Sequence, residues 1–142
     1  MRFVKVKAKK LRYAIELSTE GELREENGVV LETPAEWSPE HLVLAALVRC
    51  ALKSLRHHAP RSGVDVRSAS GSARTLVTRQ QWEGRYAMVK TEVELRIEIE
   101  PELGRAELSD LLEDTEHDCF VGSSLTVGPE YRWTVNGRRI GW

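Results

Sequence analysis

Apolar and polar positions along the chain change their period several times, and each change predicts a different element. The longest helix is expected over residues 38–60, where an unbroken apolar run over 42–48 continues into further apolar positions. Ser38 suits the N-cap, Pro39 the first helical position, and Pro60 the end, where proline is expected to force the preceding residue out of helical geometry. Because the segment is apolar nearly all round, we expect a helix buried at the centre of the core.

Alternation with a period of two predicts strands before this helix. Two strands are expected within residues 1–19, the first around residues 3–6 and the second over 11–17. The polar segment 22–27 is expected to form a loop or the tip of a hairpin, and residues 29–31 a short third strand.

Strands are also expected after the helix. Residues 64–79 form one, and the small residues around Gly71 indicate that another backbone or a helix approaches it closely. Residues 85–100 alternate between apolar and mostly charged positions, which is typical of a strand with one solvated face. The two segments therefore predict a long hairpin.

The last third of the chain predicts two helices and a strand. Residues 105–116 have the spacing of an amphipathic helix, and Cys119 is expected on a second short helix or at its start. Residues 131–135 alternate as a strand, and the dipeptide at 136–137 is Asn-Gly, a strong hairpin signal. Strands and helices thus occur in blocks, which predicts an α+β fold with a mostly antiparallel sheet packed on the long central helix.

Composition narrows the possible functions. At 142 residues without repeats or linkers, we expect a single domain over residues 1–142. The 21 basic and 22 acidic residues are balanced, so binding of nucleic acid or of an anionic membrane is not expected. No segment is typical of a transmembrane helix and the start of the chain lacks the apolar region of a signal peptide, so the expected location is the cytoplasm.

The two cysteines carry the most reactive side chains of the sequence. Composition and spacing leave open whether Cys50 and Cys119 meet, and each taken alone is an ordinary small core residue. The nearby histidines His57, His58 and His117 lack the spacing of a zinc site, so no metal is expected. Glycine motifs that bind phosphates are also missing, and we expect no cofactor.

Residues 38–50, with the sequence SPEHLVLAALVRC, resemble the signature of the OsmC/Ohr family. In that family a Pro-Glu pair opens a long helix, an Ala-Ala pair follows, and a cysteine stands ten positions after the glutamate. Glu40 and Cys50 have this spacing, and Cys119 matches the second family cysteine ahead of a final strand pair. Residues 120–122 lack the proline often seen in the Ohr branch, so the chain is more similar to a general OsmC-like member.

The resemblance implies a thiol peroxidase that reduces organic hydroperoxides in oxidative-stress defence. Cys50 would be the peroxidatic thiolate, Cys119 the resolving thiol, and an external dithiol would restore both. An arginine upstream of the helix, held by the motif glutamate Glu40, would stabilise the thiolate, and Arg12 and Arg24 are the candidates. The alternative interpretation is an OsmC-like protein that binds a small molecule or a partner and has no peroxidase activity.

The spacing of the motif also bears on assembly. Ten helical residues span about 15 Å, so Glu40 and Cys50 cannot touch on one straight helix. Either the helix bends or the glutamate comes from another subunit. The resemblance implies an intertwined dimer with sites at its interface, and we expect a homodimer. RNA-binding modules of the KH type share a similar mix of elements, but their GxxG loop is missing here.

Overall fold

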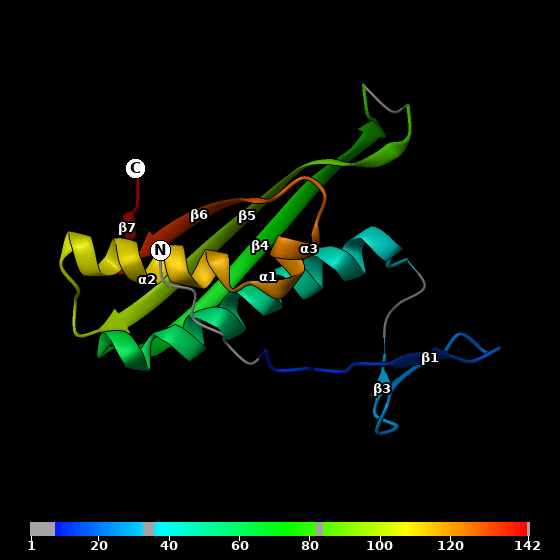
Figure 1. Cartoon of the computed structure of the whole chain (residues 1–142), viewed down its shortest axis with the longest axis horizontal. Coiled ribbons are helices and arrows are strands. Elements are labelled where there is room, and N and C mark those ends of the chain that lie inside the picture. Colours follow the sequence, from blue (N-terminus) through cyan, green and yellow to red (C-terminus); the bar gives the residue numbers. More distant parts are fainter. Residues whose placement is uncertain (1–7, 33–35, 82–83, 142) are drawn as a thin grey trace. The chain divides into compact units, whose positions relative to one another are not determined.

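The computed structural model of the chain describes residues 8–32, 36–81 and 84–141. The chain divides into two compact units, Met1–Trp37 and Ser38–Trp142, and each is described by itself. Together their elements make the α+β architecture that the sequence predicts (Figure 1). The strand expected around residues 3–6 lies outside the described residues.

The first unit is a small antiparallel sheet. Its strands are β1 (Ile15–Leu17), β2 (Leu23–Glu25) and β3 (Val30–Leu31), in the order β1-β2-β3. Residues 22–27 were expected to form a loop or the tip of a hairpin. The loop is wrong for Leu23–Glu25, which form β2, whereas residues 26–27 lie in the turn between β2 and β3. Turns at Gly21 and Gly28, both with positive φ, let this polar segment pair through its backbone with a strand on either side.

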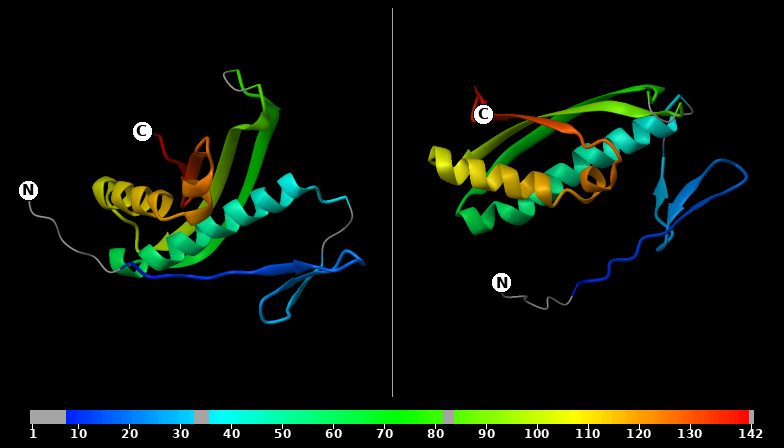
Figure 2. Two further views of the ribbon diagram at one scale, coloured as in Figure 1. Left: turned by 45° about the vertical axis from the view of Figure 1, so that its right-hand side comes forward. Right: turned by 45° about the horizontal axis from the view of Figure 1, so that its top comes forward.

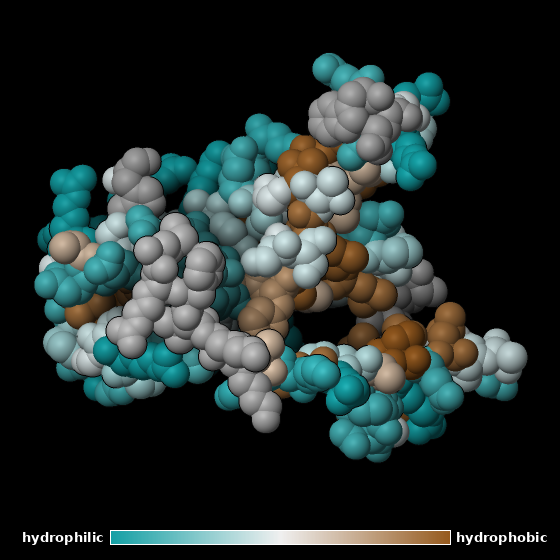
Figure 3. Space-filling model, in the orientation of Figure 1, coloured by the Kyte–Doolittle hydropathy of each residue, from teal (hydrophilic) through white to brown (hydrophobic). Residues whose placement is uncertain are grey.

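The large apolar side chains described in the first unit are mostly exposed. None of its described residues belongs to the buried core. The exposed residues are Leu11, Tyr13, Ile15, Leu17, Val29 and Leu31. Figure 3 shows apolar side chains at the surface of the molecule in brown. A sheet of this size without a covered apolar face is marginally stable in water, so this face needs a cover.

The second unit carries the helices and the larger sheet. Its elements are α1 (Pro39–His58), the 3₁₀-helix η1 (Pro60–Ser62), β4 (Asp65–Arg79), β5 (Tyr86–Glu100), α2 (Arg105–His117), α3 (Phe120–Ser124), β6 (Glu130–Val135) and β7 (Arg138–Arg139). The sheet order is β4-β5-β6-β7, and α1 and α2 lie against one face of it (Figure 2). The pair β5–β6 is parallel, which the intervening helices α2 and α3 allow because they form a crossover connection.

The core lies between this sheet and the helices. Along β5 the alternation predicted from the sequence is confirmed, because Val93, Leu95, Ile97 and Ile99 are buried and the charged residues from Glu94 onward alternate with them at the surface. Side chains from α1, α2 and β6 complete the core; they are Leu47, Ala51, Leu55, Leu111, Leu112, Trp133 and Val135.

Both ends of α1 are set by local chemistry. Ser38 is the N-cap as predicted: its hydroxyl accepts a hydrogen bond from the His41 N–H, and His41 Nδ1 accepts one from the Ser38 N–H. At the other end the prediction was wrong, because Ala59 keeps helical angles of φ −56° and ψ −48°. The chain tightens into η1 at Pro60 and leaves helical geometry only at Gly63, which has φ +76°.

A smaller part of the surface of α1 is buried than its sequence predicts. One stripe, formed by Leu47, Ala51, Ser54 and Leu55, is buried. The Ala-Ala pair at 45–46 is exposed, and the other apolar residues are only partly covered. The second unit alone therefore covers one side of a helix whose composition is that of a fully buried one.

The close approach expected at Gly71 is confirmed. A Cβ atom added there would lie 2.8 Å from Leu95 Cδ2, 2.9 Å from Val48 Cγ1 and 3.1 Å from the Glu94 carbonyl oxygen. Val48 belongs to α1, so the helix packs on β4 where the strand has no side chain. This contact sets how deeply α1 lies on the sheet.

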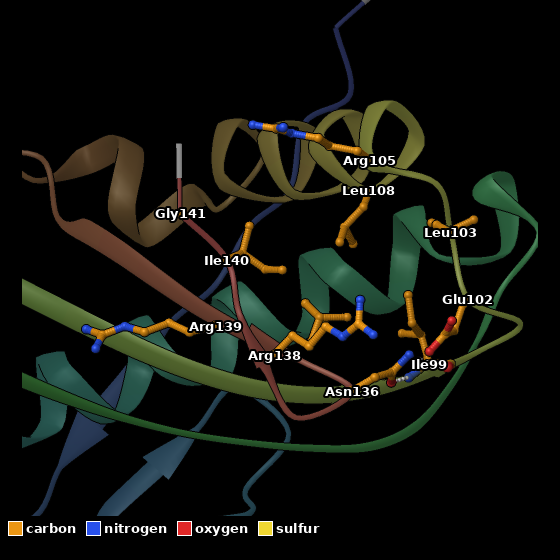
Figure 4. A pocket seen from close by; sticks show the side chains of 11 residues that line it. Ile99, Glu102, Leu103, Arg105, Leu108, Asn136, Arg138, Arg139, Ile140 and Gly141 are labelled. Atoms are coloured by element: carbon orange, nitrogen blue, oxygen red, sulfur yellow. Dashed lines mark hydrogen bonds between the residues drawn. The ribbon is translucent and has the colours of Figure 1, made fainter.

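The turn between β6 and β7 is formed by Asn136 and Gly137, as predicted, with φ values of +51° and +78°. The Asn136 side chain also extends the pairing with β5. Its Oδ1 accepts a hydrogen bond of 2.9 Å from the Ile99 N–H, and its Nδ2 donates one of 3.2 Å to the Ile99 carbonyl oxygen (Figure 4). The side-chain amide thus replaces a residue of the strand.

Replacing Gly71 by alanine tests the seating of α1. We expect Gly71→Ala to lower the free energy of unfolding by about 1–3 kcal/mol, because the new methyl group overpacks the contact with Val48 and Leu95. Gly128→Ala is the matched control, since nothing lies within 4 Å of the Cβ that it adds. Urea unfolding of the three proteins measures the difference, and equal stabilities would contradict this account of the contact.

Candidate thiol site

The second unit brings Cys50 and Cys119 together. Cys50 lies in the middle of α1 and is partly buried, whereas Cys119 is the fully buried N-cap residue of α3. The Cys50 thiol lies near enough to Cys119 to contribute to raising its pKa. Both cysteines are free thiols. The structure thus answers the question that spacing left open.

Two contacts between α1 and the end of α2 hold this arrangement. The Ser54 hydroxyl donates a buried hydrogen bond of 2.8 Å to the Thr115 carbonyl oxygen. One turn further along α1, His58 Nε2 lies 2.7 Å from the Asp118 carboxylate. Because Asp118 directly precedes Cys119, these contacts fix the backbone that carries the second thiol.

The turn after Cys119 is tight and includes a glycine for a steric reason. The Ser123 N–H donates a 2.9 Å hydrogen bond to the Cys119 carbonyl oxygen, which folds the segment over the thiol. A Cβ atom at Gly122 would lie 2.2 Å from Tyr131 Oη and 3.4 Å from Cys119 Sγ. Glycine at this position therefore leaves room for the tyrosine hydroxyl beside the sulfur atom.

The groups around the thiols are acidic. Burial raises the pKa of Cys119, and the Tyr131 hydroxyl and the Gly122 backbone N–H only partly oppose this. The pKa of Tyr131 is also raised, first by burial and then by its interactions with Cys119, Glu116 and Cys50. Burial raises the pKa of Glu116 as well, with a smaller opposing effect of Trp133. Burial is thus the largest cause that raises the pKa of each of these three groups.

A cation from the second unit does not offset this tendency. In the described part of the chain, the main influences on the pKa values of Cys119 and Tyr131 include no lysine or arginine. Thiol chemistry requires a thiolate, and an adjacent cation is the usual means of stabilising one in a protein. The second unit thus brings two thiols together, and the buried thiol, Cys119, has a raised pKa.

The other predicted site residues are Glu40, Arg12 and Arg24. Glu40 stands in the first turn of α1, and the unbroken helix separates it from Cys50 by about 15 Å, so the two do not meet within one chain. Arg12 and Arg24 belong to the first unit. Arg24 pairs there with Glu22 at 2.5 Å and donates a hydrogen bond to the Gly28 carbonyl oxygen. A role of either arginine at the thiols stays a prediction.

Two residues of the site were missed from the sequence. Tyr131 was interpreted only as an alternating strand residue, and Glu116 only as part of an amphipathic helix. The available signal was the alternation of Tyr131, Trp133 and Val135, which places the tyrosine on the core face of β6. The residues near Tyr131 in sequence do not indicate that its side chain lies beside Cys119.

A separate cavity of about 300 Å³ lies between the end of β5, the start of α2 and the β6–β7 hairpin (Figure 4). Leu108 and Ile140 line it together with Arg138, and neither cysteine does.

Among the residues described, no group of three or more His, Cys, Asp or Glu side chains could hold a metal ion. No helix in the described ranges is both long and apolar enough to cross a membrane.

Sequence comparison identifies the family. The family model described as OsmC-like protein matches residues 32–134, a span that includes Glu40, Cys50 and Cys119. A comparison with curated protein sequences finds no match.

Solved structures with the same fold include several OsmC-like proteins. An OsmC-like protein of unknown function from Vibrio cholerae has a TM-score of 0.73 at 12% identity, over 88% of this chain and 100% of its own. An organic hydroperoxide resistance protein from Elizabethkingia anophelis has a TM-score of 0.61 at 19% identity, over 89% and 96%. An organic hydroperoxide resistance protein from Legionella pneumophila has a TM-score of 0.57 at 18% identity, over 91% of this chain and 98% of its own. At these identities the likeness concerns the fold.

The His58–Asp118 contact predicts a pH-dependent stability. His117 and His58 lower the pKa of Asp118 below its ordinary value of 3.8, so the folded state favours the carboxylate. This stabilisation is complete above 3.8 and is lost as the pH falls through the lower folded value. We expect Asp118→Asn to reduce stability slightly at neutral pH, because Asp118 is 45% exposed, and the difference to close in acid.

Urea unfolding at a series of pH values measures this difference. Asp110→Asn on the exposed face of α2 is the control and should follow the unmodified protein at every pH. A stability gap of Asp118→Asn that stays constant into acid would exclude the proposed role of the carboxylate.

Proposed function

The chain belongs to the family of OsmC-like proteins, and on that premise we propose that it reduces organic hydroperoxides with a pair of cysteine thiols. The observation that carries the proposal is the juxtaposition of two free thiols, one partly exposed on α1 and one buried at the start of α3. The substrate class comes from the related structures, two of which are named organic hydroperoxide resistance proteins.

The proposed cycle has three steps. The Cys50 thiolate attacks the terminal oxygen of the hydroperoxide, the O–O bond breaks, and the organic fragment leaves as an alcohol after taking up a proton. Cys50 is then a sulfenic acid. The Cys119 thiolate attacks its sulfur, so that a disulfide forms and water leaves. An external dithiol finally reduces the disulfide by thiol exchange and regenerates both thiols.

The accessibility of the two cysteines suits these roles. Cys50 is partly exposed and can meet a substrate, whereas Cys119 has no exposed surface. A reducing compartment such as the cytoplasm would keep both thiols available between turnovers.

The first step needs a cation beside Cys50. We assign this role to Arg12 or Arg24 of the first unit, held by Glu40, and infer that an intertwined homodimer completes the site. Two features support the dimer: the partly covered faces of α1 and the exposed apolar side chains of the first unit. A partner chain would cover both surfaces and bring a glutamate that one straight helix cannot bring to Cys50.

A second candidate function is supported by the acidity of the site. Burial, with a smaller effect of Cys50, raises the pKa of Cys119, which is also what a structural thiol in an apolar setting shows. In this alternative the chain is an OsmC-like protein that binds a small molecule or a partner, and its thiols are inert.

Intact-mass spectrometry after one equivalent of cumene hydroperoxide separates the two functions. We expect the reduced protein to lose two hydrogen masses as the disulfide forms. Cys119→Ser should instead gain one oxygen, because the sulfenic acid of Cys50 has no partner. Cys50→Ser should stay unchanged. Unchanged masses of all three proteins would support the binding protein and exclude the peroxidase.

The assembly is tested by light scattering on a size-exclusion column. We expect a mass twice the 16.1 kDa of one chain. Ile15→Asp should raise the dissociation constant of the dimer by about tenfold or more, because it would bury a charge in the covered apolar face. Glu16→Gln, on the neighbouring residue of β1, is the control. A single-chain mass of the unmodified protein would contradict the dimer.

A further inference from the structure

The Tyr131 hydroxyl is a buried polar group to which the proposed cycle gives no role. Its oxygen is fully buried, and no hydrogen-bond partner of regular geometry is found for it in the described parts of the chain. Buried hydroxyl groups are nearly always paired, because leaving one unpaired forfeits its hydrogen bonds to water. This hydroxyl therefore needs an explanation.

The sulfur of Cys119 is the reactive atom beside this hydroxyl. Tyr131 Oη and Cys119 Sγ lie 2.2 Å and 3.4 Å from the same point, the position that a Cβ of Gly122 would occupy. The glycine leaves that space to the hydroxyl.

The surroundings of the pair come from three elements. Cys50 faces it from α1, and Glu116 faces it from α2. Next to Cys119 in sequence, Asp118 is already paired with His58 and His117. On β6, the Trp133 Nε1 is likewise buried without a hydrogen-bond partner among the described residues, and this indole acts on Glu116, whose pKa it lowers. The Tyr131 hydroxyl is thus the side-chain donor left for Cys119.

The protonation state of Cys119 decides what this hydroxyl can do. A neutral thiol is a weak acceptor, whereas a thiolate accepts a strong, charge-assisted hydrogen bond. The interaction with Tyr131 accordingly lowers the pKa of Cys119, against the larger effect of burial. The donor has little to bind in the resting thiol state and gains a charged acceptor when Cys119 ionises.

We propose that Tyr131 serves the resolving step, by donating a hydrogen bond from its hydroxyl to Cys119 Sγ as this sulfur becomes the attacking thiolate. The inference rests on the proposed peroxidase cycle and assigns a residue to its second half. Cys119 gives up its proton and attacks the sulfur of the Cys50 sulfenic acid. The S–S bond forms, the S–O bond breaks, and the departing hydroxide takes up a proton to leave as water.

Tyr131→Phe tests this role with the ring retained. In rapid-quench mass spectrometry we expect the oxygen adduct on Cys50 to form at the unmodified rate. Its conversion to the disulfide should slow by about tenfold, with its pH midpoint shifted upward, because one pKa unit corresponds to a tenfold change in thiolate population. Tyr86→Phe, at a tyrosine that is 70% exposed, is the control. An unchanged rate and pH profile of disulfide formation in Tyr131→Phe would overturn the proposal.

A titration that needs no peroxidase activity separates this inference from the proposed function. In Cys50→Ser the ultraviolet absorbance of the thiolate, after subtraction of the tyrosinate absorbance followed at longer wavelength, reports Cys119 alone. Adding Tyr131→Phe should raise the pH at which this absorbance appears, and an unmoved titration would overturn the role of Tyr131 even if the protein reduces peroxides. A clear shift in a protein that reduces no peroxide would uphold the hydrogen bond and reject the cycle.

Gly122→Ala distinguishes the hydrogen bond from simple packing. Its new methyl group would occupy the space of the hydroxyl, so we expect it to slow disulfide formation as Tyr131→Phe does. Added to Tyr131→Phe it should have little further effect, because the phenylalanine leaves that space empty. Equal and additive losses from the two substitutions would show that they act separately and would overturn the proposal.

Discussion

The packing of α1 on β4 at Gly71 is the contact on which the rest of the structure depends. Because a glycine faces Val48, the helix comes close enough to bury the stripe that includes Leu47 and Ala51. Cys50 adjoins this stripe, so its depth at the edge of the core follows from the same contact. The hydrogen bonds of Ser54 and His58 lie further along the same helix, and they hold α2 and the residue before Cys119 in place.

Packing of the helices and the sheet fixes the positions of the two thiols. Their reactivity depends instead on the charged groups that stabilise a thiolate. Burial raises the pKa values of Cys119, Tyr131 and Glu116 above their ordinary values. Assembling two thiols and ionising them are therefore separate problems in this fold. The second unit solves the first problem, and in the proposed function a cation from the first unit solves the other. The hydrogen bond inferred for Tyr131 concerns only the resolving thiol and does not replace this cation.

Elements whose signals are local were predictable from the sequence. The N-cap of α1 depends on Ser38 and its next few residues, and the alternation in β5 reflects one face against one core. Predictions failed where the structure of a segment depends on pairing or packing with residues distant in sequence. The strand β2 forms because two turns bring neighbours to its backbone, and the exposed side of α1 depends on what covers it.

The candidate site divides in the same way. Cys50 and Cys119 could be identified through a family signature, but only the fold shows that they meet. Tyr131 and Glu116 could not be identified, because their importance arises from contacts with residues distant in sequence. The assignment of Arg12 or Arg24 is still a prediction, since it depends on how two units of the chain come together.

The side chain of Asn136 is a possible site of slow deamidation. Asn-Gly sequences deamidate readily, because little hinders attack of the glycine nitrogen on the side-chain amide, and asparagine is among the thermolabile residues. Here both atoms of that amide are held by the backbone of Ile99, which keeps it from the reactive geometry while the hairpin stays closed. Conversion to aspartate would set a carboxylate against the Ile99 carbonyl oxygen and remove a donor. Deamidation of Asn136 should therefore proceed at a rate set by how often the last hairpin opens.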